Sequence, residues 1–183
     1  MFTIGHSTRE IGEFVDLLRE FGVTCLVDVR RFPSSKRYPH FAASPLAAAL
    51  AEAGFDYVHE PDLGGYRKGR ADSPNTAWRS GSFRAYADYM EAPEFREALE
   101  RLMERAGERV TAIMCAEATP WRCHRQLISD VLVARGWDVI HILGTGRAEA
   151  HAMNPNARVL EDGRLIYRDP GSDQGDLFPD AGP

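Results

Sequence analysis

Side chains that can act as nucleophiles, acids, bases or metal ligands are concentrated in residues 115–125, which read CAEATPWRCHR. Cys115 and Glu117 open this segment, and Cys123, His124 and Arg125 close it. A cysteine beside arginine and histidine at the start of a helix has a lowered pKa and becomes a nucleophile. These residues therefore form a candidate catalytic centre, with Glu117 or His124 as its general acid or base.

The same side chains also suit a metal site. Cys115, Cys123 and His124 offer two sulfurs and an imidazole nitrogen, which are ligands that zinc prefers. His6 or Glu117 would complete the set. The spacing matches none of the standard zinc-binding patterns. Zinc is therefore a cofactor candidate that the sequence leaves open beside thiolate chemistry.

A third interpretation of this segment is an anion pocket. Arg125, together with Arg30 and the N–H groups at the start of a helix, would hold a phosphate. Cysteine phosphatases and rhodaneses also place a cysteine after a strand and before a phosphate-binding loop. Here the loop contains Glu117 and has no closing arginine at the usual position, which disfavours both of those classes.

Alternating strands and helices must position these residues. Apolar runs predict strands over residues 2–5, 24–29, 55–59, 110–115 and 137–143. Helical spacing and end signals predict helices from Ser7 to Gly22 and from Ser44 to Gly54, and over 83–91, 93–106 and 121–135. The pattern predicts a single α/β domain, residues 1–168, whose mainly parallel central sheet of about five strands is flanked by helices. A hairpin around Asp162-Gly163 ends this domain, and residues 169–183 are expected to be a flexible acidic tail.

Polar residues fall at the predicted carboxyl ends of the strands. His6 and Ser7 follow the first strand, and Asp28 and Arg30 end the second. Open parallel sheets bind ligands beyond these ends, so a crevice is expected there, shared with the cysteine segment. Ser7 is expected mainly to cap the first helix. Asp28 joins the catalytic candidates because a charged pair directly after an apolar strand needs compensation.

Other residues of reactive type have simpler explanations. Cys25 and His141 lie inside predicted strands and are expected to be core residues with satisfied polar atoms. Trp121 is either a packing residue or a stacking platform.

Two basic stretches, residues 30–41 and 64–79, interleave arginines with aromatic residues. This mixture is typical of surfaces that bind a phosphate backbone and stacked bases, although a solvated arginine surface has the same composition. The residues predicted to bind substrate or phosphate are His6, Ser7, Arg30, Ser34, Arg37, Arg67, Trp121 and Arg125.

The overall charge gives little guidance on partners. The 183 residues are 44% apolar and 27% charged, as in ordinary globular proteins, and the net charge of −5 argues against nucleic acid. Four of the 27 acidic residues lie in 169–183, where there is no Lys or Arg, so residues 1–168 hold 23 acids and 22 bases. A DNA or nucleotide partner is therefore permitted. No apolar run is long enough for a membrane span, and we expect a cytoplasmic protein with reduced thiols.

Four motifs together resemble a known family. They are Thr3-Ile-Gly-His-Ser7, Leu26-Val-Asp-Val-Arg30 with Pro33-Ser34, Leu63-Gly-Gly65, and Cys115-Ala-Glu117 with Cys123-His-Arg125. The combination resembles the bacterial and archaeal domain of unknown function 488 family over residues 3 to about 143. The resemblance implies a compact α/β domain with these motif residues as its site, and supplies no established activity.

The tail carries a separate motif. Gln174-Gly-Asp-Leu-Phe178 resembles the short peptide by which bacterial polymerases and repair proteins dock on the replication sliding clamp. Leu177 and Phe178 would anchor in an apolar pocket while Gln174 supplies hydrogen bonds. Clamp docking is therefore a candidate interaction, and the alternative is that both apolar residues fold back onto the domain.

Three functions follow from these features. The leading hypothesis is a protein of bacterial DNA maintenance that recognises or processes a base or lesion, with an extruded or single-stranded nucleotide as substrate. The second is a small-molecule enzyme with a cysteine nucleophile or a bound metal. The third is a non-catalytic adaptor that the tail tethers to a partner.

Overall fold

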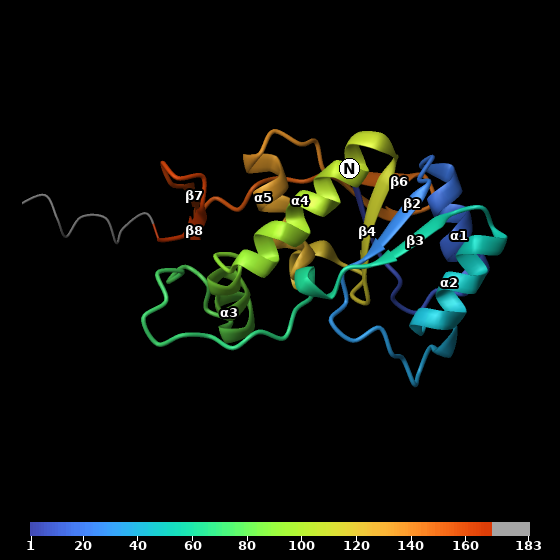
Figure 1. Cartoon of the computed structure of the whole chain (residues 1–183), viewed down its shortest axis with the longest axis horizontal. Helices are drawn as coiled ribbons and strands as arrows, with labels where there is room; N and C mark the ends of the chain where they lie inside the picture. The colour runs from blue at the N-terminus through green and yellow to red at the C-terminus, as the bar shows by residue number, and fades with distance from the viewer. Residues whose placement is uncertain (170–183) are drawn as a thin grey trace, which may run out of the picture.

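The computed structural model describes residues 1–169, which form a six-stranded sheet covered by helices and followed by a small hairpin (Figure 1). The strands of the sheet are β1 (Phe2–Gly5), β2 (Cys25–Asp28), β3 (Asp56–His59), β4 (Thr111–Cys115), β5 (Ile140–Gly144) and β6 (Arg147–Ala150). The α-helices are α1 (Ile11–Glu20), α2 (Ala43–Glu52), α3 (Gly81–Tyr89), α4 (Pro93–Glu108) and α5 (Arg125–Ala134). Short 3-10 turns are η1 (Pro39–Phe41), η2 (Pro61–Leu63) and η3 (Pro120–Arg122). The predicted α/β class is confirmed.

The strands lie in the order β3-β2-β4-β1-β5-β6, and every neighbouring pair is parallel except β5 and β6. The mainly parallel sheet is therefore confirmed. The sixth strand, β6, lies beyond the predicted set of about five. All four of its residues are exposed, and its sequence RAEA has no apolar pattern from which a strand would be predicted.

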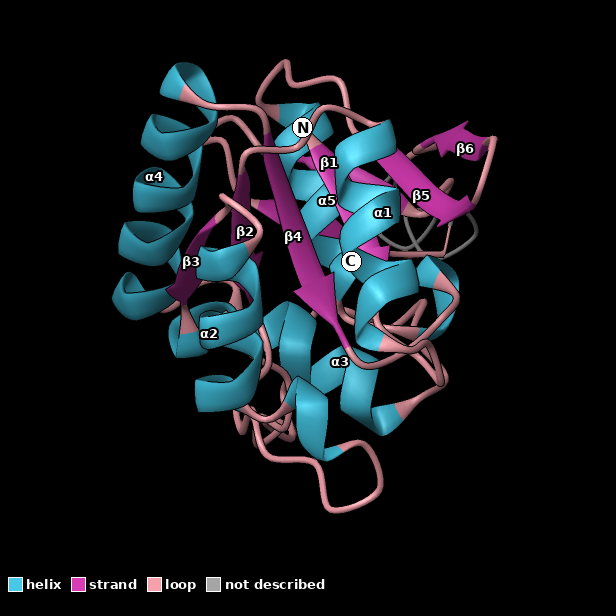
Figure 2. Cartoon of the chain, turned by 90° about the vertical axis from the view of Figure 1, so that its right-hand side faces the viewer, coloured by secondary structure: helices cyan, strands magenta, loops and turns pink. Residues whose placement is uncertain are grey.

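Helices cover both faces of the sheet (Figure 2), and each face carries its own apolar layer. Successive residues of β2 point to opposite faces, so Leu26 packs with the layer that contains α1 and α2, and Val27 packs with the layer that contains α4 and α5. Each of these two side chains is at most 1% exposed. The continuous apolar run of this strand reflects burial on both faces.

The chain changes direction at the adjacent strands β1 and β4. β1 leads through α1 to β2, β4 leads through α5 to β5, and these two helices cover opposite faces of the sheet. Such a switch point opens a crevice beyond the carboxyl ends of the two strands. The backbone N–H of His6 donates to the Cys115 carbonyl over 2.9 Å, so the first residues past each strand remain side by side.

The C-terminal hairpin packs onto the helical layer of α5. β7 (Ala157–Val159) and β8 (Leu165–Tyr167) pair antiparallel, as the Asp162-Gly163 turn predicts. The Tyr167 hydroxyl donates to the Asp130 carboxylate on α5 over 2.8 Å and is fully buried. Within residues 1–169, no helix combines the length and the apolar character needed to cross a membrane.

Candidate functional site

A pocket of about 1020 Å³ lies at the carboxyl edge of the sheet, at the switch point between β1 and β4. It brings together ten residues that the sequence singles out. These are His6, Ser7, Arg30, Ser34, Arg37, Arg67, Cys115, Glu117, Cys123 and His124. Three other predicted site residues, Asp28, Trp121 and Arg125, do not line the pocket. Trp121 is 55% exposed, and the other two are buried behind the pocket wall.

Cys123 owes its position to a break in the helix predicted over 121–135. That prediction is wrong at its start, because η3 ends at Arg122 and α5 begins only at Arg125. Cys123 between them is extended, with φ −136° and ψ 150°. Its sulfur lies 3.6 Å from Nδ1 of His124, and the Cys115 sulfur at the end of β4 lies 3.9 Å from the same nitrogen.

The His124 ring is held in one tautomer. Its Nε2 lies 3.0 Å from the Val29 carbonyl, which can only accept, so Nε2 carries the proton and donates. A neutral ring then presents the Nδ1 lone pair to the two cysteine sulfurs, whereas a ring protonated at both nitrogens donates from Nδ1 to a cysteine thiolate. Gly65 packs against this ring, because a Cβ added there would lie 3.3 Å from Nδ1. His124 is therefore oriented toward Cys115 and Cys123 and cannot transfer a proton through Nε2 to a ligand in the pocket.

The pKa values of the Cys115 and Cys123 thiols are shifted in opposite directions. A hydrogen bond to Cys123 and burial together raise the pKa of Cys115 well above its ordinary value. Burial also opposes ionisation of Cys123, but the hydrogen bond from Cys115 and the contacts with His124 and Arg125 outweigh it and hold its pKa well below the ordinary value. Of the two thiols, Cys123 is therefore the one that ionises first, and Cys115 donates to its sulfur.

Arg125 supports the site from behind the pocket wall. The side chain is 1% exposed, and within residues 1–169 it has no carboxylate partner. Its Nη2 donates to the Glu117 carbonyl over 2.5 Å, and its Nη1 donates to the Thr3 hydroxyl over 3.1 Å. Arg125, predicted to bind phosphate, thus does not line the pocket and places a buried positive charge beside Cys123.

Asp28 and Arg30 form a buried pair that orders the neighbouring wall. Two hydrogen bonds of 2.8 and 2.5 Å join the guanidinium to the carboxylate, and the Tyr57 hydroxyl donates to that carboxylate over 2.8 Å. Arg30 also donates to Nε2 of His6 over 3.3 Å. Burial and the Arg30 charge lower the pKa of His6 to about 4, so that ring is neutral at pH 7. Asp28, a predicted catalytic residue, thus holds Arg30 in place and does not itself line the pocket.

Ser7 does not cap α1, contrary to expectation. The helix begins at Ile11, its N-cap residue is Glu10, and the Glu10 side chain makes no capping hydrogen bond. Ser7 instead has φ +50°, because its N–H donates to the Ala116 carbonyl over 2.9 Å. Tyr66 has φ +59°, and these are the two non-glycine residues with positive φ among residues 1–169. Both line the pocket, so the backbone strain of the fold is concentrated there.

Gly5 permits the close approach of the two strand ends. A Cβ at this position would lie 1.8 Å from the Glu117 carbonyl oxygen, which is an impossible contact. Glu117 therefore turns back over β1, and its exposed side chain lines the pocket. Within residues 1–169, its carboxylate has no hydrogen bond or ion pair, so it is available to a ligand.

The outer wall of the pocket combines cations with exposed rings. Phe32 is 65% exposed, Tyr66 is 89% exposed, and their ring centroids lie 6.4 Å apart. Arg31 and Arg37 line the same wall and have no hydrogen bond or ion pair within residues 1–169. Arg67 differs, because its guanidinium donates to three carbonyl groups of the 61–64 turn.

Two features of this region could not be recognised from the sequence. Tyr86 on α3 lines the pocket, lies 5.2 Å from the His124 ring, and donates to the Leu63 carbonyl over 2.6 Å. Its spacing within the helix is that of a core residue, which gives no signal of a site. Arg122 also lines the pocket, although its place in a segment predicted as helix gives no sign of that.

A buried chain of hydrogen bonds links this site to the far side of β1. Thr3 contacts Nδ1 of His141 over 2.8 Å, His141 contacts His151 over 2.9 Å, and His151 pairs with Asp130 over 2.8 Å. Thr3 also accepts from Arg125. His141 thus has partners at both ring nitrogens, as expected of a core histidine.

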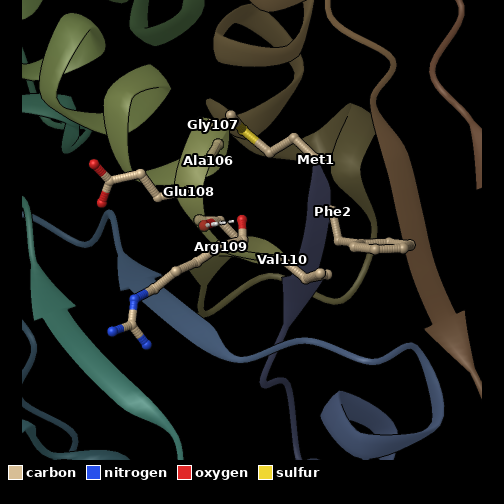
Figure 3. Close-up of a pocket in the computed structure, with 8 residues that line it drawn as sticks. Met1, Phe2, Ala106, Gly107, Glu108, Arg109 and Val110 are labelled. Carbon is tan, nitrogen blue, oxygen red and sulfur yellow. Dashed lines mark hydrogen bonds between the residues drawn. The ribbon is translucent and has the colours of Figure 1, made fainter.

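A second hollow, of about 360 Å³, lies at the opposite, amino-terminal edge of the sheet (Figure 3). The Met1 side chain points toward Gly107 near the end of α4 there, and the Phe2 ring points away from it. Its charged residues are Glu108 and Arg109, and Arg109 is already paired with Asp56. The hollow lacks the cysteine, histidine and free arginine side chains found at the carboxyl edge, so the larger pocket is the candidate site.

The fold and the site define a doubly wound α/β protein with a thiol–imidazole centre at its topological switch point. Residues 10–132, more than half of the chain, match the family described as Domain of unknown function DUF488, and the chain belongs to that family. The family resemblance seen in the motifs is thereby confirmed, although Thr3–Ser7 lies outside the matched residues. No curated protein and no solved structure matches the chain.

Proposed function

We propose that this protein binds a nucleotide, either free or as an exposed unit of single-stranded DNA, and processes it over the cysteine–histidine centre. The observation that carries the proposal is the composition of the pocket lining, where Arg31 lies 5.7 Å from the centre of the exposed Phe32 ring and Arg37 lies 5.5 Å from the centre of the Tyr38 ring. Arginines suit phosphates and exposed rings suit stacked bases. At about 1020 Å³, the pocket has room for one nucleotide.

The inner wall supplies chemical groups for such a ligand. Glu117 is the free carboxylate of the pocket and serves as general acid or base. Cys115, Cys123 and His124 form the reacting centre, and a base must leave its stack to reach them. This arrangement supports a role in DNA maintenance.

The test is binding of a fluorescent single-stranded oligonucleotide, measured by anisotropy at several salt concentrations. The Arg31→Ala/Arg37→Ala variant should bind more weakly, and its logarithmic salt dependence should be shallower by about 0.7 for each phosphate that is no longer neutralised. The Arg96→Ala/Arg105→Ala variant removes the same charge from exposed positions of α4 outside the pocket and should bind like the wild type.

The outcomes separate the remaining alternatives. Equally weakened binding in both double variants indicates a nonspecific charge effect and contradicts the proposal. Competition by a nucleoside monophosphate as strong as that by the oligonucleotide identifies a free nucleotide as the ligand. Binding of neither ligand leaves a small-molecule enzyme or an adaptor and rejects the nucleotide site.

We further propose that Gln174-Gly-Asp-Leu-Phe178 docks on the bacterial sliding clamp. The support is the sequence alone, because these residues lie outside the described part of the chain. The Leu177→Ala/Phe178→Ala variant should lose clamp binding in calorimetry, since both apolar anchors are removed. The Pro179→Ala/Asp180→Ala variant alters the adjacent pair and should retain it. Unchanged binding in the first variant would reject the motif.

A further inference from the structure

The geometry points to a metal centre formed by Cys115, Cys123 and His124 that holds one thiophilic divalent cation, with Zn²⁺ as the best match. Two sulfurs and Nδ1 of His124 lie within 4.8 Å of one another and are the one group of three potential ligands found among residues 1–169. All three residues line the pocket, so a bound ion would face its interior.

The separations agree with a shared ion. Zinc binds sulfur at about 2.3 Å and imidazole nitrogen at about 2.0–2.1 Å in tetrahedral geometry, which places a ligating sulfur and nitrogen about 3.6 Å apart. The distances from Nδ1 are 3.6 Å to the Cys123 sulfur and 3.9 Å to the Cys115 sulfur. Both nitrogen-to-sulfur distances therefore lie within a few tenths of an ångström of the separation expected at zinc.

Hydrogen bonding alone explains this arrangement less well. Nδ1 of His124 makes one hydrogen bond at a time, through its lone pair or its proton, yet both sulfurs lie within 3.9 Å of it. A single cation would contact all three atoms at once. Nε2 already donates to the Val29 carbonyl, and this outer contact is the one that metal-bound histidines characteristically make.

The ligand set selects the class of ion and its coordination. Two thiolates and an imidazole favour zinc and other soft or borderline ions over Mg²⁺ and Ca²⁺. His6 does not complete the set, because its Nδ1 contacts the Ser7 carbonyl and its Nε2 contacts Arg30. Three protein ligands with an open fourth position are typical of catalytic zinc, whereas structural sites have four.

The surrounding charges suit a water or an anion at the open position. Two thiolates neutralise a divalent cation, and the buried Arg125 then leaves one positive charge beside the site. The Glu117 carboxylate, which has no hydrogen bond or ion pair among residues 1–169, lines the same pocket. The inference goes beyond nucleotide binding and does not depend on it.

The test measures metal in the full chain, purified under reducing conditions, without any nucleotide. We expect about one zinc ion per chain by elemental mass spectrometry. Co²⁺ exchanged into the site should show a sulfur-to-cobalt charge-transfer band in its absorption spectrum. Cys115→Ser, Cys123→Ser and His124→Ala should each lose the metal. Cys25→Ala removes the third cysteine, which lies in β2 outside the cluster, and should retain it.

A second measurement covers variants that fail to fold. In the wild-type protein, a chelator should make two additional thiols reactive, and added Zn²⁺ should protect them again. Substoichiometric metal together with no Co²⁺ uptake would overturn the inference, as would equal metal loss in Cys25→Ala. A Cys115–Cys123 disulfide in the reduced-purified chain, seen as the loss of two hydrogens from its mass, would also overturn it.

Discussion

Arg30 donates two hydrogen bonds, of 2.8 and 2.5 Å, to the carboxylate of Asp28, which is completely buried. The pair joins the end of β2 to the pocket, because the same guanidinium also reaches His6. A charge that is buried this deeply is tolerated only with its partner in place. The stability of the fold and the shape of the pocket are therefore coupled through these two side chains.

The first prediction concerns this pair. Asp28→Asn removes the negative charge and leaves the buried Arg30 uncompensated, so the free energy of unfolding should fall by about 3–5 kcal/mol. Urea denaturation followed by circular dichroism measures the loss. Asp162→Asn is the matched control, because the Asp162–Arg164 pair lies at the surface and its removal should leave the urea midpoint nearly unchanged. A similar loss in both variants would contradict the structural role of Asp28.

The second prediction concerns Gly5. Gly5→Ala forces a Cβ into the Glu117 carbonyl, so it should destabilise the protein and displace the Glu117 turn from the pocket. Gly12→Ala is the control, because Gly12 lies in α1 with open space around it and should gain up to about 1 kcal/mol. Thermal denaturation of the two variants should therefore shift in opposite directions. A stable Gly5→Ala variant would show that β1 and the Glu117 turn are not in close contact.

The sequence was sufficient for the architecture because apolar burial dominates its pattern. The run from Cys25 to Val29 is buried on both faces and could be recognised as a central parallel strand. β6 could not be recognised in this way, because it contributes backbone pairing and buries no side chain. Polar residues located directly after the strands could then be predicted to share one pocket, because parallel strands bring their carboxyl ends to the same edge of the sheet.

The role of each residue in the site depends on its three-dimensional contacts, which the spacing of residues along the sequence does not reveal. Arg125 and Asp28 are polar residues in the expected region, yet both are bonded to neighbours and neither lines the pocket. Ser7 satisfies the capping pattern, but the contact of β1 with β4 places it in a left-handed conformation instead. The extended residue at Cys123 likewise follows from tertiary contacts, which override the local helical pattern.

The third prediction is a loss of stability in mild acid that depends on His141. Burial and the neighbouring His151 and Arg125 lower the pKa of His141 from 6.5 to about 4. Between these values the unfolded chain binds a proton that the folded ring does not, so stability should decline as pH falls from about 6.5 to 4. His6, with its pKa also lowered to about 4, adds to the same decline.

Urea midpoints at pH 7.5 and pH 5 test this prediction. His141→Gln should be less stable at pH 7.5, because the contacts with Thr3 and His151 are disrupted. It should lose less stability than the wild type on going to pH 5, because one of the depressed groups is absent. Parallel declines in the two proteins would show that His141 does not contribute to the acid sensitivity.

The fourth prediction uses the strained backbone at Tyr66. Its ring is 89% exposed and contributes little to the core, while its φ of +59° lies in the left-handed region that favours glycine. A side chain kept at this position despite the strain is explained if the ring contacts a ligand. Removal of the ring should therefore weaken binding of single-stranded DNA without harming the fold.

Two substitutions separate the ring from the backbone. Tyr66→Gly and Tyr66→Ala both remove the stacking surface and should weaken binding by about 1–3 kcal/mol, or roughly 5- to 150-fold. They differ in stability, because glycine relieves the left-handed strain and alanine does not, so Tyr66→Gly should be the more stable by about 1 kcal/mol. Anisotropy and urea denaturation measure the two effects independently. If Tyr66→Gly binds like the wild type, the exposed ring has no part in recognition, and the strain at this position serves the loop alone.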